Sequence, residues 1–265
     1  MAIILAAGLG SRLNAAGRLA PKGLLRLGDK PIIEESIQRL LAVGIERIVI
    51  VTGHLAEQFE PLEASYRGVV TLVHNPHFAD SGSMYSLFCA RDLVDDDFLL
   101  LESDLIYERR CLSECLAAPS RNVLLLTGFS QTSDEVFVAM RSGCLQGMSK
   151  DKRALTEEAH DCEIKGELVG ISKISQELFA IMIEKAVSRF RTTRHMDYES
   201  DCLVAAAQET AIACLLIEDL ICCEIDDTTH LARARDVIYP AVINKDTVHQ
   251  DTAEDRSAPA AGVSP

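Results

Sequence analysis

Near its N-terminus the chain reads Leu5-Ala-Ala-Gly-Leu-Gly-Ser-Arg-Leu13, and Pro21-Lys22 follows shortly after. The apolar run from Ala2 to Ala7 leads directly into the glycines, which is typical of a buried parallel strand that ends in a loop. Glycines in such a loop let backbone N–H groups approach a phosphate chain, because no side chain blocks them. Arg12 and Lys22 would then flank that polyphosphate with fixed positive charge. The stretch therefore predicts an α/β fold with a phosphate-binding loop after its first strand.

Two common phosphate-binding motifs do not fit this stretch. A dinucleotide fingerprint needs a third glycine at the position where Leu13 stands. A Walker A loop needs Lys followed by Ser or Thr, whereas Gly23 follows Lys22. A nicotinamide-dependent oxidoreductase is therefore disfavoured, and a glycine-rich turn beside two solvated cations remains the simplest alternative.

The alternation of strand and helix continues through the first half of the chain. Apolar spacing predicts strands at Ile48 to Val51, Val69 to Val73 and Phe98 to Leu101, and helices at Pro31 to Val43, Leu55 to Ala64 and Ser83 to Asp92. Strand–helix–strand units at this spacing indicate a parallel, doubly wound sheet.

The second half is less regular, and it ends in a segment without apolar periodicity. We expect strands at Asn122 to Thr127, Glu167 to Ile171, Ile212 to Ile217 and Leu220 to Ile225, a hairpin around Arg141-Ser142-Gly143, and helices at Ser175 to Phe190, Glu199 to Gln208 and Thr229 to Val237. The last of these helices would end before Tyr239-Pro240. One domain is thus predicted over residues 1–245. Residues 246–265, rich in Ala, Ser, Pro and acids, are predicted to be a disordered tail or linker.

Composition limits the class of partner. The 265 residues are 48% hydrophobic, and 26 Lys and Arg oppose 40 Asp and Glu, which gives a net charge of −14. A nucleic-acid binder needs a basic face to displace counterions from phosphates, and an anionic membrane also attracts basic segments, so both partners are disfavoured. An anionic substrate would need a local positive pocket.

The sequence also favours a cytoplasmic protein. The apolar run at the N-terminus has no charged segment before it and is only six residues long, and acidic residues interrupt the most apolar later stretch, Ala211 to Ile225. The nine cysteines are an odd number without CxxC spacing, so we expect reduced, mostly buried thiols rather than disulfides or metal ligands.

Acidic residues follow two of the apolar stretches. Asp104 ends Leu99-Leu-Leu-Glu-Ser-Asp104, and Asp226 stands in Glu224-Ile-Asp-Asp227. A carboxylate at the carboxyl edge of a parallel sheet points into the crevice where ligands bind. Solvated strand-end acids are the simpler interpretation, and at the second position Asp227 and Glu224 compete with Asp226.

A turn rich in serine precedes one predicted helix. Ser81-Gly-Ser-Met-Tyr-Ser86 follows Asn75-Pro76, and its hydroxyls and backbone donors suit a nucleobase edge or, more simply, a helix cap. These residue types do not distinguish a pyrimidine from a purine.

Together, LAAGLGSRL and Pro21-Lys22 resemble the signature of the nucleotidyltransferase superfamily, whose members join a nucleoside triphosphate to a phosphorylated small molecule. The resemblance covers about Met1 to Asn244 and implies a three-layer α/β/α fold with a mostly parallel, mixed central sheet. It implies that Lys22 and the first loop hold the triphosphate, and that Asp104 and Asp226 bind Mg²⁺, a hard cation that suits carboxylate oxygens. The nucleotide-binding residues that it implies are Leu5, Ala6, Ala7, Gly8, Gly10, Ser11, Ser81, Gly82 and Ser83.

The closer resemblance is to cytidylyltransferases that act on the small zwitterions phosphocholine and 2-aminoethylphosphonate. SGSMYSLFCARD, LLLESDLIYE, DEVFV, MSKD and GELVGISKIS carry it and favour the 2-aminoethylphosphonate enzymes. The implied reaction transfers CMP from CTP to that phosphonate. Lys150 would meet the anionic end of the acceptor and Asp197 the cationic end, with a cation–π contact from Tyr198. An exposed hairpin lysine and a helix N-cap are the simpler interpretations of Lys150 and Asp197.

Other functions remain as alternatives to this one. A phosphocholine cytidylyltransferase or a sugar-1-phosphate nucleotidyltransferase would use the same fold. A catalytically silent nucleotide sensor would be expected to lack Lys22 or a metal-binding acid, and this chain has Lys22 and Asp104. The residue types leave the oligomeric state open, a homodimer included.

Overall fold

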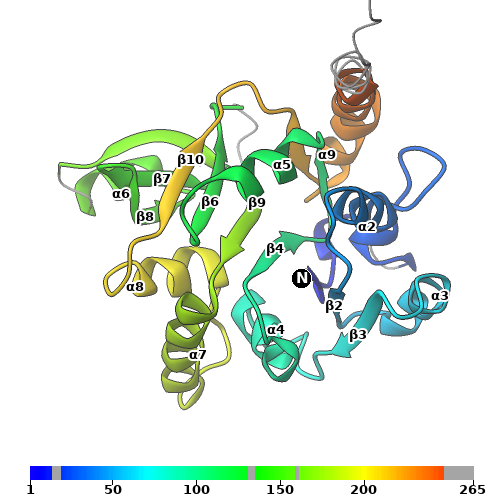
Figure 1. Cartoon of the computed structure of the whole chain (residues 1–265), viewed down its shortest axis with the longest axis horizontal. Coiled ribbons are helices and arrows are strands. Elements are labelled where there is room, and N and C mark those ends of the chain that lie inside the picture. The colour runs from blue at the N-terminus through cyan, green and yellow to red at the C-terminus, as the bar shows by residue number, and fades with distance from the viewer. Residues whose placement is uncertain (14–18, 131–134, 159–160, 248–265) are drawn as a thin grey trace, which may run out of the picture.

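The computed structural model describes residues 1–13, 19–130, 135–158 and 161–247. Nine strands in this part of the chain form one sheet: β1 Ala2–Ala6, β2 Ile48–Thr52, β3 Val70–His74, β4 Phe98–Glu102, β6 Val123–Thr127, β7 Phe137–Arg141, β8 Cys144–Ser149, β9 Glu163–Ile174 and β10 Ala213–Leu216. Their order across the sheet is β3-β2-β1-β4-β9-β6-β10-β8-β7 (Figure 1).

The directions of the strands confirm a mostly parallel, mixed sheet. β3, β2, β1 and β4 are mutually parallel, and β6 and β10 pair in parallel as well. β9 lies antiparallel between β4 and β6, and it also pairs with β7, which forms the predicted hairpin with β8. The carboxyl ends of β1, β4 and β6 therefore meet at one edge of the sheet.

Helices cover both faces of the sheet, as Figure 1 shows. In β1, Ile3 and Leu5 enter one apolar core while Ala2, Ile4 and Ala6 enter the other, because successive strand residues point to opposite faces. The first core contains residues of α4 Ser83–Cys89, α7 Gln176–Phe190, η5 Tyr198–Leu203 and α8 Val204–Ala206. The second contains residues of η3 Ala56–Phe59, α2 Ile32–Ala42, α3 Glu60–Ser65 and α5 Arg110–Ala117. The fold is thus the expected three-layer α/β/α arrangement.

Shorter elements complete the described chain. They are η1 Ser11–Leu13, η2 Lys22–Leu24, η4 Arg91–Leu93 and α6 Lys152–Glu158. A separate two-stranded sheet pairs β5 Leu105–Tyr107 with β11 Cys222–Glu224 in antiparallel orientation. Because β5 follows β4 closely, this pairing brings the chain after β11 back to the carboxyl edge of the main sheet.

The last helix is longer than the sequence predicts. It starts with α9 Thr228–Arg233, passes through the π-helical turn η6 Ala234–Ile238 and continues as helix to residue 247. The expected end before Tyr239-Pro240 is wrong. A proline inside a regular helix removes a hydrogen bond and clashes with the preceding turn, and the wider turn just before Pro240 accommodates it.

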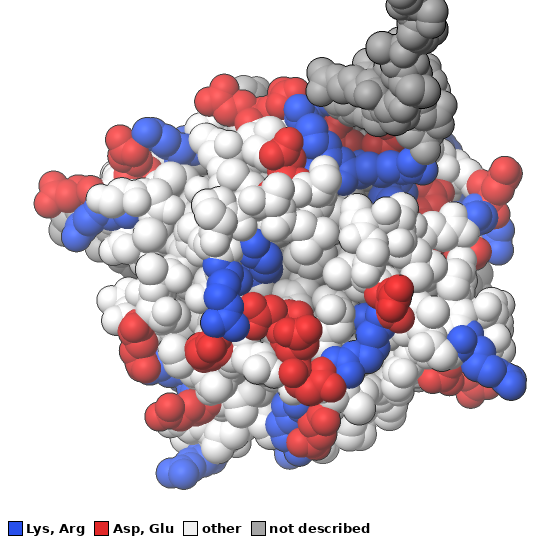
Figure 2. Space-filling view, viewed as in Figure 1, with Lys and Arg blue, Asp and Glu red and all other residues white. Residues whose placement is uncertain are grey.

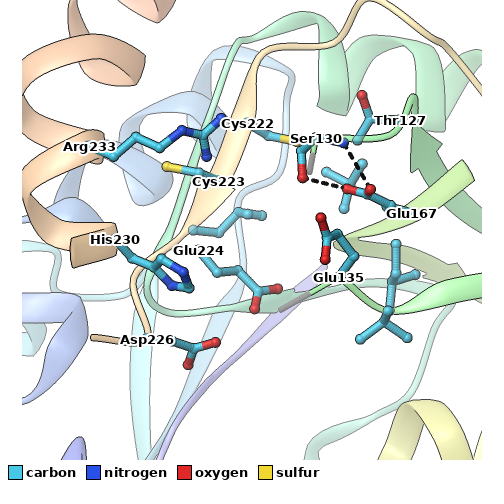
Figure 3. A pocket seen from close by; sticks show the side chains of 14 residues that line it. Thr127, Ser130, Glu135, Glu167, Cys222, Cys223, Glu224, Asp226, His230 and Arg233 are labelled. Carbon is cyan, nitrogen blue, oxygen red and sulfur yellow. Dashed lines mark hydrogen bonds between the residues drawn. The ribbon is translucent and has the colours of Figure 1, made fainter. Parts of the chain in front are cut away.

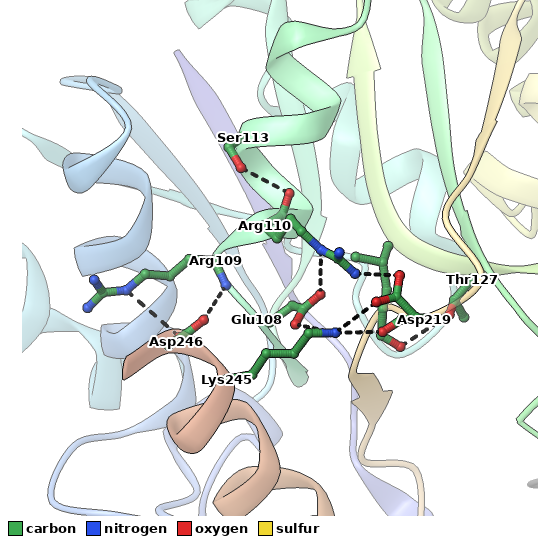
Figure 4. Close-up of polar contacts among 9 residues, drawn as sticks. Glu108, Arg109, Arg110, Ser113, Thr127, Asp219, Lys245 and Asp246 are labelled. Carbon is green, nitrogen blue, oxygen red and sulfur yellow. Dashed lines mark hydrogen bonds and ion pairs between the residues drawn. The ribbon is translucent and has the colours of Figure 1, made fainter. Parts of the chain in front are cut away.

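Ion pairs hold the end of this helix against the body of the domain (Figure 4). Asp246, 7% exposed, accepts hydrogen bonds from Arg39 Nη2 at 3.1 Å and from the Arg109 backbone N–H at 2.8 Å. Lys245 Nζ lies 3.2 Å from Oε2 of Glu108, which is fully buried. The helix thus includes Asp246, where we expected the tail to begin, and residues 248–265 of that predicted tail lie outside the described residues.

Only Cys111, Cys115 and Cys202 of the nine cysteines are fully buried, so the expectation of mostly buried thiols is met at three positions. Over the described ranges, we find no helix long and apolar enough to span a bilayer. The face in Figure 2 carries both basic and acidic side chains, and they lie in several small groups.

Candidate active site

The loop after β1 leaves backbone open to a ligand. Gly10 has a φ of +60°, the left-handed region that glycine adopts without strain, and a Cβ added at Gly8 would meet nothing within 4 Å. Gly8, Ser11 and Arg12 are exposed. Leu5, Ala6 and Ala7 are buried, and their contact with a nucleotide stays a prediction.

Four of the predicted residues converge at the carboxyl edge of the sheet. Lys22 Nζ donates to Asp104 Oδ2 and to Asp226 Oδ1, each at 2.8 Å, and Arg12 Nη2 donates to Asp226 Oδ1 at 2.7 Å. These residues come from the loop after β1, from η2, from the end of β4 and from the chain after β11. We call them the ion cluster. The motifs singled out in the sequence therefore form one site.

A glycine that the sequence analysis passed over allows this approach. A Cβ added at Gly23 would lie 2.9 Å from the carbonyl oxygen of Ser103, closer than real contacts permit. Because Gly23 has no side chain, η2 can pack against the end of β4, which places Lys22 beside Asp104. A glycine directly after a candidate catalytic lysine was the available signal.

The ion cluster fixes the charge of Lys22. Burial by itself would lower the pKa of this ammonium, but the negative charges and hydrogen bonds of Asp104 and Asp226 outweigh burial and raise its pKa. Lys22 is therefore a permanent cation in the cleft, which suits the neutralisation of a polyphosphate.

The pair Asp104 and Asp226 fits a divalent cation that is shared with a substrate. Their side chains are 11% and 10% exposed, and an oxygen of each lies at hydrogen-bond distance from the same Lys22 nitrogen. Within the described ranges, no group of three or more His, Cys, Asp or Glu side chains is arranged to hold a metal by itself. Mg²⁺ commonly takes one or two carboxylates and completes its octahedron with phosphate oxygens and water, so two acids are an adequate protein contribution.

The choice between Asp226 and Asp227 follows from their contacts. Asp227 accepts hydrogen bonds from the backbone N–H groups of Thr229 and His230, both at 2.8 Å, and caps α9. These bonds hold the pKa of Asp227 below its usual value. Asp226 faces Lys22 and Arg12 instead, so the candidate metal ligand is Asp226.

Ser81, Gly82 and Ser83 lie at the start of α4. Ser81 Oγ accepts from Asn75 Nδ2 at 3.1 Å, and Ser83 Oγ accepts from the Tyr198 backbone N–H at 2.9 Å. Gly82 occupies the N-cap position of α4, and no side chain caps the helix, so the simpler capping interpretation is wrong. The segment instead contacts residues 194–198.

The predicted acceptor residues are placed differently from one another. Asp197 is exposed and makes no side-chain capping bond, and Lys150 is exposed and lowers the pKa of Glu199 by its charge. Tyr198 is fully buried in the first apolar core, and its hydroxyl donates to Glu199 Oε1 at 2.8 Å. The cation–π role expected of Tyr198 is therefore wrong, because the packed core encloses its ring.

Three further carboxylates lie near the site: Glu102 and Glu199, which the sequence analysis did not single out, and Glu224, which was named only as a competitor of Asp226. Burial, followed by the negative charges of their acidic neighbours, raises the pKa of each above its usual value. Glu102 and Glu224 each stand two residues before a predicted metal ligand. Residues two apart in an extended chain point to the same side, so this spacing indicated that both glutamates lie near the metal ligands. Glu199 comes from η5 and had no such signal.

A pocket adjoins the ion cluster (Figure 3). Glu224 and Asp226 line one part of the pocket, and Arg233 and Glu167 lie on opposite sides of it. Glu167 accepts from the Ser130 backbone N–H at 2.8 Å and from Ser130 Oγ at 2.7 Å. The pocket thus borders the ion cluster at Asp226, and its lining is mixed, with four acids among apolar side chains, hydroxyls and thiols.

The sequence matches the MobA-like NTP transferase domain over residues 2–159, more than half of the chain, and the chain belongs to that family. Two solved structures share its fold. One is the CTP:phosphocholine cytidylyltransferase of Streptococcus pneumoniae, with a TM-score of 0.66, 23% identity, and coverage of 89% of this chain and 97% of that chain. The other is the inositol-1-phosphate CTP transferase of T. maritima, with a TM-score of 0.71, 18% identity, and coverage of 86% and 90%.

Curated relatives resemble the chain in sequence. A CMP-5'-(3-aminopropyl)phosphonate synthase of Streptomyces rubellomurinus is 30% identical over 232 residues, which are 85% of this chain and 37% of that protein. A 2-aminoethylphosphonate cytidylyltransferase of Lancefieldella rimae is 35% identical over 151 residues, 56% of this chain and 60% of that protein. A choline-phosphate cytidylyltransferase of Streptococcus pneumoniae is 37% identical over 107 residues, 40% and 46%. The chain spans less than two thirds of the length of each of these three.

Proposed function

We propose that this protein is a Mg²⁺-dependent cytidylyltransferase that transfers CMP from CTP to 2-aminoethylphosphonate and releases pyrophosphate. The observation that carries the proposal is the convergence of Lys22 with Asp104 and Asp226 beside an open glycine loop. Fixed cations and paired carboxylates at one sheet edge suit a nucleoside triphosphate and its metal. Such a site has little covalent chemistry to do and acts by positioning and charge stabilisation.

The reaction needs no covalent intermediate on the protein. A phosphonate oxygen of the acceptor attacks the α-phosphorus of CTP and forms the new P–O bond, while the bond from the α-phosphorus to the α,β-bridging oxygen breaks. The electron pair of that bond leaves with pyrophosphate. No general base is required, because the attacking oxygen is already ionised. Lys22 and Arg12 stabilise the negative charge that develops on the triphosphate, and bound Mg²⁺ would supply further charge neutralisation.

The acceptor is proposed to be a small zwitterion held by opposite charges. Lys150 would bind the phosphonate, and Asp197 with the neighbouring Glu199 would bind the ammonium group. A primary ammonium donates three hydrogen bonds, whereas a trimethylated nitrogen donates none and favours aromatic walls. The chain has no Trp, and the ring of Tyr198 is buried, so the residues near Asp197 favour a primary amine.

The activities for which the relatives are named support the same class of reaction. Two of them act on aminoalkylphosphonates and one on choline phosphate. The choice of 2-aminoethylphosphonate over a related acceptor rests on the motifs of the closer resemblance. We further propose that the substrates are soluble small molecules and that neither nucleic acid nor membrane is a partner.

A pyrophosphate-release assay tests this proposal. The four nucleoside triphosphates are each combined with 2-aminoethylphosphonate, phosphoethanolamine, phosphocholine and glucose 1-phosphate. CTP with 2-aminoethylphosphonate should give the highest kcat/KM. A preference for phosphocholine would overturn the named acceptor alone, whereas turnover of the sugar phosphate without any turnover of a zwitterion would overturn the proposal.

A further inference from the structure

A short contact joins the segment predicted to bind the nucleobase to the segment that carries Asp197. The Gly82 backbone N–H donates to the carbonyl oxygen of Arg194 at 2.9 Å, and that of Met84 donates to the carbonyl oxygen of Met196 at 3.0 Å. The Tyr198 backbone N–H donates to Ser83 Oγ at 2.9 Å. We call this contact between residues 82–84 and residues 194–198 the clasp.

Glycine is required at the centre of the clasp. A Cβ added at Gly82 would lie 2.4 Å from the carbonyl oxygen of Met196 and 2.7 Å from its nitrogen. Both atoms belong to the backbone, so a side chain at residue 82 would force the two segments apart. The family resemblance implied that Gly82 contacts the nucleobase, and in the structure its lack of a side chain allows this close approach.

The clasp also sets the direction of Asp197. Met196 is 7% exposed and Tyr198 is fully buried, whereas Asp197 between them is exposed in an extended conformation, with φ −84° and ψ 140°. The side chains on either side of Asp197 are thus fixed in the core, and its own carboxylate points away from that core. Ser83 Oγ lies 3.5 Å from Asp197 Oδ1. Ser83 therefore contacts Asp197 directly and also the backbone of the next residue, Tyr198, while the Asp197 backbone N–H donates to Asp201 Oδ2 at 3.0 Å.

From this geometry we infer that Ser83 and Gly82 are positioning residues that couple the binding of the nucleotide to the binding of the acceptor. The inference rests on the proposed function, in which residues 81–83 contact the base and Asp197 holds the ammonium group. A nucleotide that orders residues 81–84 also orders residues 194–198, because the clasp joins them. Acceptor binding should then be tighter with nucleotide present, and the coupling must be reciprocal.

Calorimetric binding with α,β-methylene-CTP, which cannot release pyrophosphate at that bond, tests the coupling. The acceptor Kd of the wild type is measured with and without the analogue, in Mg²⁺, and should be lower by roughly fivefold or more when the analogue is bound. Ser83→Ala should reduce this ratio towards one, and the Kd of the analogue alone is measured beside it, because Ser83 is itself predicted to contact the base. Ser83→Thr retains the hydroxyl and should restore the coupling.

Two further variants complete the test, one as a control and one as a second disruption of the clasp. Ser113→Ala removes a serine hydroxyl that bonds only within α5, to the carbonyl oxygen of Arg110, and should leave the coupling unchanged. Gly82→Ala should lose the coupling by forcing the segments apart. Circular dichroism and Tm report whether each variant is folded, and a folded Ser83→Ala suffices for the test even where Gly82→Ala unfolds.

The outcomes separate the inference from the proposed function. A folded Ser83→Ala that keeps the wild-type coupling ratio would overturn the inference, whether or not its affinity for the nucleotide falls. A wild type that binds a sugar phosphate and no zwitterion would overturn the proposed function. In that case the Kd of the sugar phosphate is measured with and without the nucleotide analogue. A ratio that Ser83→Ala lowers towards one would support the coupling, and a ratio that it leaves unchanged would overturn it.

Discussion

On the proposed nucleotide side of the cleft, Lys22 and Arg12 meet Asp104 and Asp226 at 2.7–2.8 Å, so each charge has an opposite partner. On the acceptor side, Glu199 accepts a hydrogen bond from Tyr198, and the charge of Lys150 only partly offsets its acidic neighbours. The first arrangement raises the pKa of the Lys22 ammonium and keeps it charged, whereas burial and acidic neighbours raise the pKa of Glu199 in the second. The comparison suggests that the nucleotide side is organised in advance and that a cationic substrate group completes the acceptor side.

The largest effect should come from Lys22→Ala, which removes the cation shared by both aspartates. Losing one charge-stabilising donor at a reacting centre costs on the order of 3–4 kcal/mol, or about 10²–10³-fold in kcat. Steady-state pyrophosphate release measures this loss. Lys30→Ala is the matched control, because Lys30 bonds to Gln38 outside the cleft, and it should retain activity within about twofold. A folded Lys22→Ala that keeps more than about a tenth of wild-type turnover would remove Lys22 from the mechanism.

Adjacent aspartates provide a sharper test of the nucleotide side. Asp226→Asn removes one anionic oxygen ligand and should raise the Mg²⁺ concentration for half-maximal activity, as Asp104→Asn should, because Mg²⁺ requires hard anionic oxygen. Asp227→Asn should leave the Mg²⁺ titration and the Tm nearly unchanged, since asparagine caps a helix about as well as aspartate. The metal assignment fails if Asp227→Asn shifts the titration and Asp226→Asn does not.

The acceptor side is tested by removing charge from the protein and from the substrate together. Asp197→Asn should raise the KM for 2-aminoethylphosphonate by about tenfold and leave the KM for CTP unchanged, because a hydrogen bond between charged groups contributes roughly 1.5–3 kcal/mol. Ethylphosphonate lacks the amine, so its KM should not respond to this substitution. Lys150→Ala should raise the KM of both phosphonates. An equal response of both to Asp197→Asn would show that Asp197 does not contact the ammonium group.

The smallest effect concerns stability. Burial raises the pKa of Glu199 in the folded protein, so the folded state holds this proton at pH values where the unfolded chain releases it. The Glu199 contribution therefore lowers stability as pH rises above the usual glutamate value and through the raised one. Glu199→Gln should increase Tm at pH 8 and leave it nearly unchanged at pH 4. A Tm difference that does not grow with pH would contradict the assigned burial.

The same two sides differ in how far the sequence predicts them. β1, β2 and β4 are continuous apolar runs, and candidate site residues follow β1 and β4, so the local pattern predicts both the strands and the edge where these residues meet. The hairpin β7–β8 was also predictable, because a Ser-Gly pair between two apolar stretches favours a tight turn. In the structure Ser142 and Gly143 have the positive φ values that such a turn requires, 52° and 76°.

Long-range pairing accounts for most of what the sequence did not predict. β9 was expected only near Glu167 to Ile171, but it spans Glu163–Ile174, because it pairs with β4, β6 and β7, which periodicity cannot identify. The proximity of Glu199 to Lys150 likewise depends on how distant segments pack. Resemblance placed Tyr198 at the acceptor, and only the packing of the core shows that its ring is enclosed.

The reaction product tests the central claim most directly. In ³¹P NMR, a mixture of the protein, Mg²⁺, CTP and 2-aminoethylphosphonate should lose both substrate signals and gain those of pyrophosphate and of a coupled pair of phosphorus atoms, one a phosphonate and one a phosphate. That pair identifies the new P–O–P bond between CMP and the phosphonate. CTP and 2-aminoethylphosphonate left unchanged, under conditions in which the same protein converts a sugar 1-phosphate to a nucleotide sugar, would contradict the account.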